Sequence, residues 1–360
     1  MRTIFVTGFP GFLASALIPT LVQRKASPRR VDCIVLPHLL DSAHQRAQEI
    51  STKADCEIRV FAGDITDIRL GMGNEYGVVT KECSEIFHLA AIYDLAVAKD
   101  VAERVNVDGT RNVLAFATDC PELDRFHHIS TCYVSGRFDG VFRENDLQTG
   151  QAFSNHYEST KFESEVLVHD AASSGLPTTI YRPSIVSGDS HTGRTQKMDG
   201  PYFFVQWMLA QPRIAVMPVF AGSREATMNI VPSDYITAAI ATLSTGRDRP
   251  LRVYSLADPS PLTIPALTQL LAHATGRRVL RVPATRWLAS ALIRSVSHLH
   301  PDMDIPGEAV NYLAHPTHYD CSNTLQDLEG SGVACPPFAE YVDRLVGFVR
   351  DESGFGRRRL

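Results

Sequence analysis

The chain has 360 residues, of which 44% are hydrophobic, 8% aromatic and 21% charged. This composition excludes a disordered or fibrous protein and is sufficient for a full hydrophobic core in two domains. Because 35 Lys and Arg stand against 40 Asp and Glu, the net charge is −5, and nucleic acid is not expected as a partner. No run of about 18 apolar residues is present and no signal-like segment opens the chain, so we expect a cytoplasmic protein without a transmembrane segment.

Cysteine and histidine spacings give no metal signature. The seven cysteines form no CxxC pair, and the close histidines match neither HxxxH nor HExxH. These spacings predict reduced, mostly buried thiols, ordinary histidines and no metal site.

Short apolar runs alternate with helical stretches through the first half of the chain. The expected strands are residues 3–7, 31–36, 57–61, 85–89, 125–130 and 178–181. The expected helices are residues 11–24, 41–53, 100–118 and 156–172. This alternation predicts an α/β fold with a Rossmann-type, doubly wound parallel sheet.

The pattern changes after Ile185. Residues 187–225 are rich in Gly, Pro, Ser and Thr, apart from one aromatic helical stretch around Tyr202 to Trp207. Beyond it we expect a strand at 228–231, a helix from 233 to about 244, a strand at 252–256, a helix at 263–275 and a helical remainder with irregular breaks to 351. The predicted NAD(P)-binding domain is discontinuous, residues 1–184 plus about 226–258, and a smaller, mainly helical substrate-binding domain comprises 185–225 plus 259–360.

A phosphate-binding turn is predicted at residues 7–14, TGFPGFLA, between the first strand and the first helix. Gly8 permits the tight turn, Gly11 allows close approach of a pyrophosphate, and Ala14 allows close packing of the helix. Because the proline of GFPG has no N–H, the donors are expected from the three residues that follow it. The alternative is a glycine turn without a ligand.

The residues after the second strand bear on the choice between NAD and NADP. An acid at this point would hold the ribose 2′-OH of NAD, but Pro37 and His38 stand there instead. Arg46 could turn toward a 2′-phosphate, so NADP is favoured and NAD stays open. Asp64, after the third strand, could accept a hydrogen bond from the adenine amino group, with an ordinary helix cap as the alternative.

A tyrosine and a lysine mark the candidate catalytic centre. Tyr157 and Lys161 are four residues apart on a predicted helix and therefore share a face. An ammonium at this distance favours the phenolate and so lowers the pKa of the tyrosine. Thr131 ends the preceding strand at the edge where doubly wound sheets bind ligands, and its hydroxyl can hold a substrate carbonyl. A structural Tyr–Lys pair is the alternative for the YxxxK spacing alone.

These motifs together resemble the extended short-chain dehydrogenases/reductases. The motifs that carry the resemblance are TGFPGFLA (7–14), GDI (63–65), HLAA (88–91), NVDGT (106–110), STCYVSG (130–136), YESTK (157–161), RPSIVSGDS (182–190) and NIVPSDYI (229–236). The forms GFLA, RPSIVSGDS and NIVPSDY are most similar to the branch that holds fatty acyl-CoA reductases and the thioester reductase domains of carboxylic acid reductases. Two departures are an alanine at 14, where many relatives have glycine, and Pro37-His38, where the branch often has an arginine.

The resemblance implies hydride transfer from a reduced nicotinamide to a carbonyl. Tyr157 would donate the proton, Lys161 would lower its pKa and hold the nicotinamide ribose, and Thr131 would orient the substrate oxygen. With the phosphate turn, Arg46 and Asp64 included, the expected cofactor-binding residues are Thr7, Gly8, Pro10, Gly11, Phe12, Leu13, Arg46, Asp64, Ile65, Leu89, Ala90, Ala91, Asn106, Tyr157, Lys161, Pro183, Ser184 and Ile185.

The first hypothesis for function is a reductase of an acyl thioester, or of an aldehyde or ketone on a lipid-like chain. Residues 203–209 would form an apolar wall over the nicotinamide, or else the core of the small domain. Residues 287–296, WLASALIRSV, would form a buried helix or a lipid-contacting one. The expected partner is an apolar or acyl small molecule, and a homodimer stays open.

Other functions are available to the same fold. A ketoreductase or hydroxysteroid-type dehydrogenase is one, and a nucleotide-sugar epimerase is disfavoured because the second domain is rather apolar. A non-catalytic NADP-sensing protein has no need of a proton donor, so the intact Tyr157 and Lys161 disfavour it.

Overall fold

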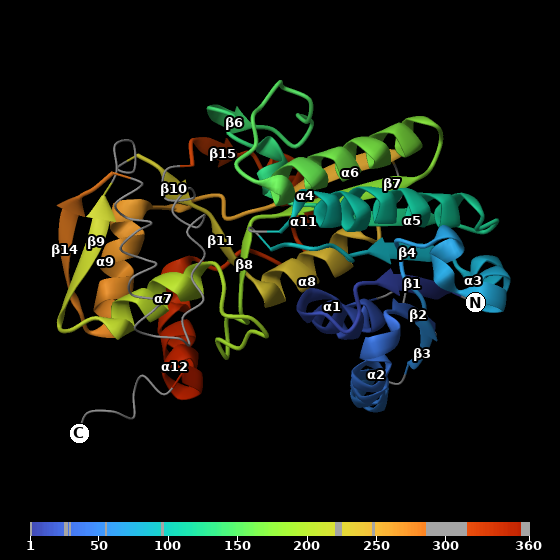
Figure 1. Cartoon of the computed structure of the whole chain (residues 1–360), viewed down its shortest axis with the longest axis horizontal. Helices are drawn as coiled ribbons and strands as arrows, with labels where there is room; N and C mark the ends of the chain where they lie inside the picture. The colour runs from blue at the N-terminus through green and yellow to red at the C-terminus, as the bar shows by residue number, and fades with distance from the viewer. Residues whose placement is uncertain are drawn as a thin grey trace.

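A computed structural model of the chain describes residues 2–24, 28, 30–54, 56–94, 97–219, 225–246, 249–285 and 315–353. Its centre is a seven-stranded parallel sheet with helices on both faces (Figure 1). The strand order is β12-β7-β5-β4-β1-β2-β3, so the chain reverses direction across the sheet between β1 and β4. The predicted Rossmann-type, doubly wound sheet is confirmed.

The strands of this sheet follow the predicted runs with small shifts at their ends. They are β1 (Thr3–Thr7), β2 (Arg30–Val35), β3 (Glu57–Ala62), β4 (Glu85–His88), β5 (Arg125–Ile129), β7 (Thr178–Pro183) and β12 (Leu251–Leu256). The covering helices are α1 (Phe12–Gln23), α2 (Leu40–Ala54), α3 (Tyr76–Glu82), α4 (Lys99–Ala102), α5 (Gly109–Thr118), α6 (His156–Ser173), α8 (Ser233–Leu243) and α11 (Ser322–Leu328). The expected helix at 100–118 is interrupted by a π-helical segment, η4 (Glu103–Asp108).

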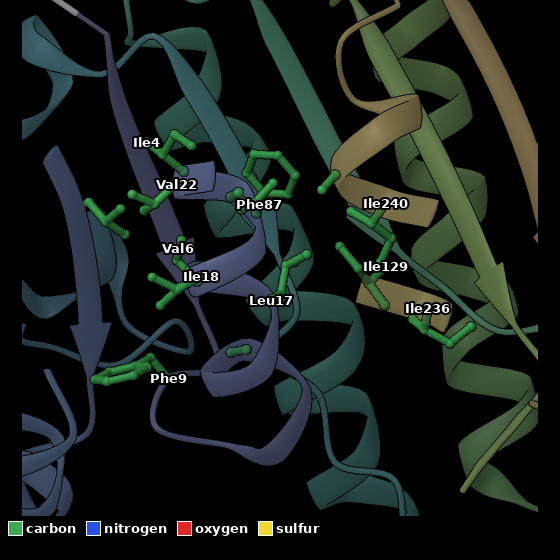
Figure 2. Packing of buried hydrophobic residues seen from close by; sticks show 14 of the residues in the cluster. Ile4, Val6, Phe9, Leu17, Ile18, Val22, Phe87, Ile129, Ile236 and Ile240 are labelled. Atoms are coloured by element: carbon green, nitrogen blue, oxygen red, sulfur yellow. The ribbon is translucent and has the colours of Figure 1, made fainter. Parts of the chain in front are cut away.

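Two hydrophobic cores cover the two faces of the sheet. Because side chains alternate along a strand, Ile4 and Val6 of β1 lie in the core formed with α1 and α8 (Figure 2). Phe5 points to the opposite face and stacks on Phe116 of α5, with 4.4 Å between the ring centroids. Burial on both faces explains the apolar run in the middle of β1, TIFVT.

A third core lies at the other end of the molecule from the N-terminus. It is built from α7 (Pro201–Ala210), α9 (Ile264–Thr275) and α12 (Val342–Ser353), and the ribbon of β9 (Ile214–Val219) and β14 (Arg278–Pro283) lies beside α9 (Figure 1). Four short ladders complete the described structure. Their strands are β6 (Gly140–Phe142) with β15 (Thr317–Tyr319), β8 (Ile185–Ser187) with β11 (Ile230–Pro232), and β10 (Thr227–Met228) with β13 (Leu262–Thr263), besides β9 with β14.

The prediction of a helical remainder to residue 351 is wrong at two places. Residues 278–283 form β14 and residues 317–319 form β15, each paired in parallel with a strand far earlier in the chain. Short apolar runs do not distinguish a strand from a helix unless the partner strand is known. The segment 287–296 lies outside the described residues.

The expected domain boundaries stay a prediction, and two observations bear on them. Helix α11, assigned to the second domain, packs on the sheet, where Leu328 joins the core of α1 and α8. Conversely, Met228 and Ile230 belong to the core of α7, α9 and α12. All seven cysteines carry free thiols, and no helix in the described ranges is long and apolar enough to cross a membrane.

Candidate active site

A cavity of about 1090 Å³ lies at the carboxyl ends of the parallel strands and extends to α7. Ligands of doubly wound sheets bind at this edge, next to the point where the strand order reverses. The predicted site residues that line the cavity are Gly8, Pro10, Gly11, Phe12, Leu13, Asp64, Ile65, Leu89, Ala90, Ala91, Thr131, Tyr157, Lys161, Pro183, Ser184 and Ile185. Three others, Thr7, Arg46 and Asn106, are not among the lining residues.

The turn between β1 and α1 has the geometry of a phosphate cradle. Gly8 has a φ of +86°, and a Cβ there would lie 2.8 Å from the nitrogen of Ala90. Gly11 donates its N–H to the carbonyl of Gly8 at 2.9 Å, so one of the three predicted donors is used within the turn itself. No side chain caps the N-terminus of α1. The N–H groups of residues 12–14, in its first turn, are therefore available to bind an anion.

Thr7 supports the cavity from behind rather than lining it. Its fully buried hydroxyl accepts the N–H groups of residues 89–90 at 3.1 and 3.0 Å, and it lies 2.8 Å from Nδ1 of His88. Nε2 of His88 lies 3.0 Å from Thr110, whose own proton goes to a carbonyl one turn earlier. These contacts require the neutral Nε2–H tautomer, in agreement with a pKa of His88 that burial and the charge of Lys161 lower to about 3.

Asn106 lies in the π-helical segment and acts as a brace. Its Oδ1 accepts the N–H of Ile92 at 2.8 Å, and its Nδ2 donates to the carbonyl of Ile92 and to the hydroxyl of Thr160, both at 3.0 Å. The side chain therefore ties the loop after β4, one wall of the cavity, to α6. Asn106 does not line the cavity itself, but it holds Ile92, which does.

The region after β2 is apolar. Leu36 and Leu39 line the cavity there, whereas Arg46 forms an exposed ion pair with Glu49, 2.8 Å between Nη1 and Oε2. Asp64 lines the cavity while its Oδ1 accepts the N–H of Thr66 at 2.8 Å, so the turn-capping role and the exposure to the cavity coexist.

The three predicted catalytic side chains meet in the cavity. The side chains of Thr131 and Tyr157 are hydrogen-bonded, and burial raises the pKa of Tyr157 to about 12 although this hydrogen bond opposes the rise. Lys161 donates to the carbonyl of Ile129 at 2.9 Å. Burial lowers the pKa of Lys161 to about 8, against the opposing charge of Glu165.

The expectation that Lys161 lowers the pKa of Tyr157 is not met in this structure, because complete burial outweighs other influences on the phenol. The phenol of Tyr157 is consequently uncharged at neutral pH. Lys161, with a pKa of about 8, stays mostly charged there.

A buried ion pair beside these residues was not predicted. Glu165 of α6 accepts hydrogen bonds from Ser130 and from Arg182 of β7, with 2.6 Å between Nη2 and Oε1. Burial alone would raise the pKa of Glu165, but Arg182 and hydrogen bonds from its neighbours bring it down to about 2. Its position four residues after Lys161 was the one available signal in the sequence, since its partners are distant in the chain.

The aromatic stretch of α7 divides between the two roles considered for it. Phe203 and Phe204 line the cavity, whereas Met208 and Trp207 are buried in the third core, where the indole N–H donates to the carbonyl of Val216 at 3.0 Å. Neighbouring residues of one helix thus line the cavity and fill the core, and Phe203 and Phe204 also pack against that core.

A cation–π contact joins two sides of the cavity, and the sequence did not indicate it. Nζ of Lys197, in the segment before α7, lies 4.8 Å from the ring centroid of Tyr93, in the loop after β4. It also lies 4.0 Å from Oδ2 of Asp199. All three residues line the cavity.

Residues 6–240 match the family described as male sterility protein. This range covers more than half of the chain and includes every predicted catalytic residue. The chain belongs to the male sterility protein family. It is an extended short-chain dehydrogenase/reductase, an NAD(P)-dependent oxidoreductase by family, as its motifs predict.

Relatives of this family member include parts of larger biosynthetic proteins. It is 30% identical over 260 residues to a non-canonical nonribosomal peptide synthetase of Aspergillus campestris, covering 67% of this chain and 24% of that protein. It is 25% identical over 346 residues to an aldehyde reductase of Aspergillus flavus, covering 89% of this chain and 33% of that protein. The chain therefore spans about a quarter to a third of these relatives.

Solved structures share its fold. The terminal R domain from the myxalamid PKS-NRPS biosynthetic pathway superposes with a TM-score of 0.82 at 24% identity, covering 98% of this chain and 92% of that chain. The reductase domain of a nonribosomal peptide synthetase from Mycobacterium tuberculosis gives a TM-score of 0.74 at 18% identity, covering 99% and 92%. At these identities the likeness establishes the fold.

Proposed function

We propose that this family member reduces the carbonyl of an apolar or acyl substrate, an acyl thioester or a fatty aldehyde, with NADPH as hydride donor. The observation that carries the proposal is that Thr131, Tyr157 and Lys161 line the same cavity as the phosphate cradle of α1. The name of one relative, an aldehyde reductase, supports the same chemistry.

The side chains divide the reaction as follows. The reduced nicotinamide, when bound, supplies the hydride. The hydroxyl of Thr131 holds the substrate oxygen, and Tyr157, kept neutral by burial, gives that oxygen its proton as negative charge develops. Lys161, one helical turn away, stabilises the phenolate that remains and would hold the nicotinamide ribose. The first turn of α1 would hold the pyrophosphate.

The preference for NADPH rests on the absence of an acid at residues 36–39, directly after β2. Leu36 and Leu39 face the cavity where an NAD-specific site would place a carboxylate. Thermal melts with NADPH and with NADH at equal concentration test the preference, because the ligand that binds the folded protein more tightly raises its stability more. A larger rise in Tm with NADH would contradict it.

The apolar character of the substrate rests on Phe203, Phe204 and Met228, which line the end of the cavity next to the third core. NADPH oxidation is measured separately with acyl-CoAs, fatty aldehydes and β-keto esters. Consumption with acyl-CoAs or fatty aldehydes is expected. Consumption with keto esters alone would favour a ketoreductase, and binding of NADPH without turnover of any substrate would favour the sensor. The cytoplasmic location and the homodimer stay predictions.

A further inference from the structure

Helix α6 is fastened to the end of β5 by two consecutive contacts. The carbonyl of Ile129 accepts the ammonium of Lys161 at 2.9 Å, and the hydroxyl of the next residue, Ser130, donates to the carboxylate of Glu165. Thr131, which holds the substrate oxygen in the proposed mechanism, follows directly. A shift of Glu165 would therefore move both the hydroxyl and the ammonium of the site.

Arg182 of β7 fixes the carboxylate from the other side. Its Nη2 and Nε lie 2.6 and 3.0 Å from Oε1 of Glu165. The guanidinium is itself held by the carbonyls of Asp146, at 2.8 Å, and Glu144, at 3.2 Å. Because the side chains of Arg182 and Glu165 are only 1% and 0% exposed, neither charge is screened by water.

The charges around Lys161 come from three elements. Glu165 lies on the same helix and is the charged group that acts on the pKa of Lys161. Arg182 of β7 contacts the carboxylate of Glu165, and so does His169, one turn further along α6, whose Nε2 lies 3.5 Å from Oε1. His128 of β5 and His88 of β4 are both fully buried, and burial lowers the pKa of each, so they are uncharged at neutral pH. A charge removed from the Glu165–Arg182 pair is thus felt by Lys161.

We propose that Glu165 is a positioning residue of this active site. Through Ser130 it fixes the hydroxyl of Thr131, and through its charge, balanced by Arg182, it sets the pH range in which Lys161 stays protonated. Because turnover is one readout, the proposal rests in part on the proposed function.

Opposite substitutions in the pair test this role. Glu165→Gln removes the negative charge that acts on Lys161 and leaves Arg182 without its carboxylate partner, so it should move the alkaline limb of the kcat profile to lower pH by about one unit. Arg182→Gln leaves the carboxylate alone and should move that limb to higher pH. The double substitution removes both charges and should return the limb toward its wild-type position. If the pair served folding alone, both single variants would have a lower kcat, and the alkaline limbs of their kcat profiles would lie at the same pH.

A second readout does not need turnover. The affinity for NADPH, followed by quenching of its fluorescence across pH, should show the same opposite displacements, because the ammonium of Lys161 is placed on the ribose side of the site. If the wild type binds NADPH but reduces none of the substrates, the proposed function fails while this titration still decides the role of Glu165. Limbs that coincide in both readouts would overturn the proposal.

Two further variants guard against misfolding. Glu165→Asp keeps the charge but shortens the reach to Ser130, so we expect a lower kcat with an unmoved limb; a limb displaced as far as in Glu165→Gln would contradict the assignment. Glu85→Gln breaks the buried pair with Arg24 at the other edge of the sheet, 2.6 Å between Nη2 and Oε2. It should lower Tm and leave the limb in place.

Discussion

Among the described residues, two buried Arg–Glu pairs of the same length lie at opposite ends of the strands of one sheet. Arg24 and Glu85 meet at the amino ends of the strands, and Arg182 and Glu165 meet at the carboxyl ends, each with 2.6 Å between nitrogen and oxygen. The first pair also bonds the hydroxyl of Ser244 and joins α1, β4 and α8. In the second pair, Glu165 also accepts a hydrogen bond from Ser130, and it lies on α6, the helix that carries Lys161.

Position rather than strength separates these two pairs. A buried ion pair is by itself weak support for stability, because desolvation offsets most of its attraction. At the carboxyl edge the same chemistry adjoins the residues that follow each parallel strand, where ligands bind. The Glu85 pair therefore joins elements of the fold away from the cavity, and the Glu165 pair lies next to the candidate active site. The following variants compare single side chains at the candidate active site with similar side chains elsewhere in the molecule.

The largest difference is expected between two buried tyrosines. Tyr157→Phe removes the proposed proton donor and should lower kcat by about 10²- to 10⁴-fold, the usual contribution of a general acid. Tyr181→Phe removes a hydroxyl that bonds Nδ1 of His127 at 3.2 Å, away from the cavity. It should cost about 1 kcal/mol of stability and leave kcat nearly unchanged. Steady-state kinetics and urea unfolding of both variants measure the contrast, and a fully active Tyr157→Phe that stays folded would show that the acid is another group.

A smaller difference is expected between adjacent histidines of β5 that face opposite sides of the sheet. Both are fully buried, and burial lowers the pKa of each well below 6.5. Below pH 6.5 the unfolded chain binds protons that the folded one does not, so each histidine reduces stability as the pH falls, by about 1.4 kcal/mol per pH unit.

His128→Phe should therefore leave stability near pH 7 almost unchanged, because neither ring nitrogen of His128 has a hydrogen-bond partner among the described residues. The variant should become more stable than the wild type at pH 5. His127→Phe loses its bond to Tyr181 and should cost about 1 kcal/mol at pH 7. Urea titrations at both pH values compare the variants, and a wild-type slope between pH 5 and 7 in His128→Phe would refute the assignment.

The smallest effect is expected at the contact that crosses the cavity. Lys197→Met keeps an apolar side chain and removes the cation over the Tyr93 ring, an interaction of about 0.5 to 1 kcal/mol at such exposure. KM should rise about two- to five-fold with kcat nearly constant. Lys197→Arg keeps the cation and should match the wild type; equal KM increases in both variants would assign the effect to packing instead.

Local sequence was sufficient for much of this architecture. The glycine turn, the strands of the sheet and the Tyr157–Lys161 helix each depend on neighbouring residues or on burial patterns within one element, so motifs and periodicity predict them. Thr131 also follows from position alone, because it ends a strand at the ligand-binding edge.

The parts that the sequence did not predict depend on contacts between distant segments. Glu165 meets Ser130 and Arg182 only after three elements have assembled. β14 is a strand because β9 lies beside it. The high pKa of Tyr157 follows from how completely neighbouring elements cover the phenol, which an i, i+4 spacing does not specify.

Glu144 shows what this assembly means for exchanging parts between relatives. Its carboxylate accepts the N–H of Ser255 in β12 at 2.8 Å, the N–H of Asn323 at 2.5 Å and the hydroxyl of Thr324 at 2.8 Å at the start of α11. A chimera that replaces everything after β12 would leave this buried acid with the N–H of Ser255 as the one remaining donor of these three, and each lost hydrogen bond to the charged group would cost about 1.5 to 3 kcal/mol. Recombination that swaps substrate specificity therefore has to carry the loop of Glu144, β12 and α11 as one inherited block.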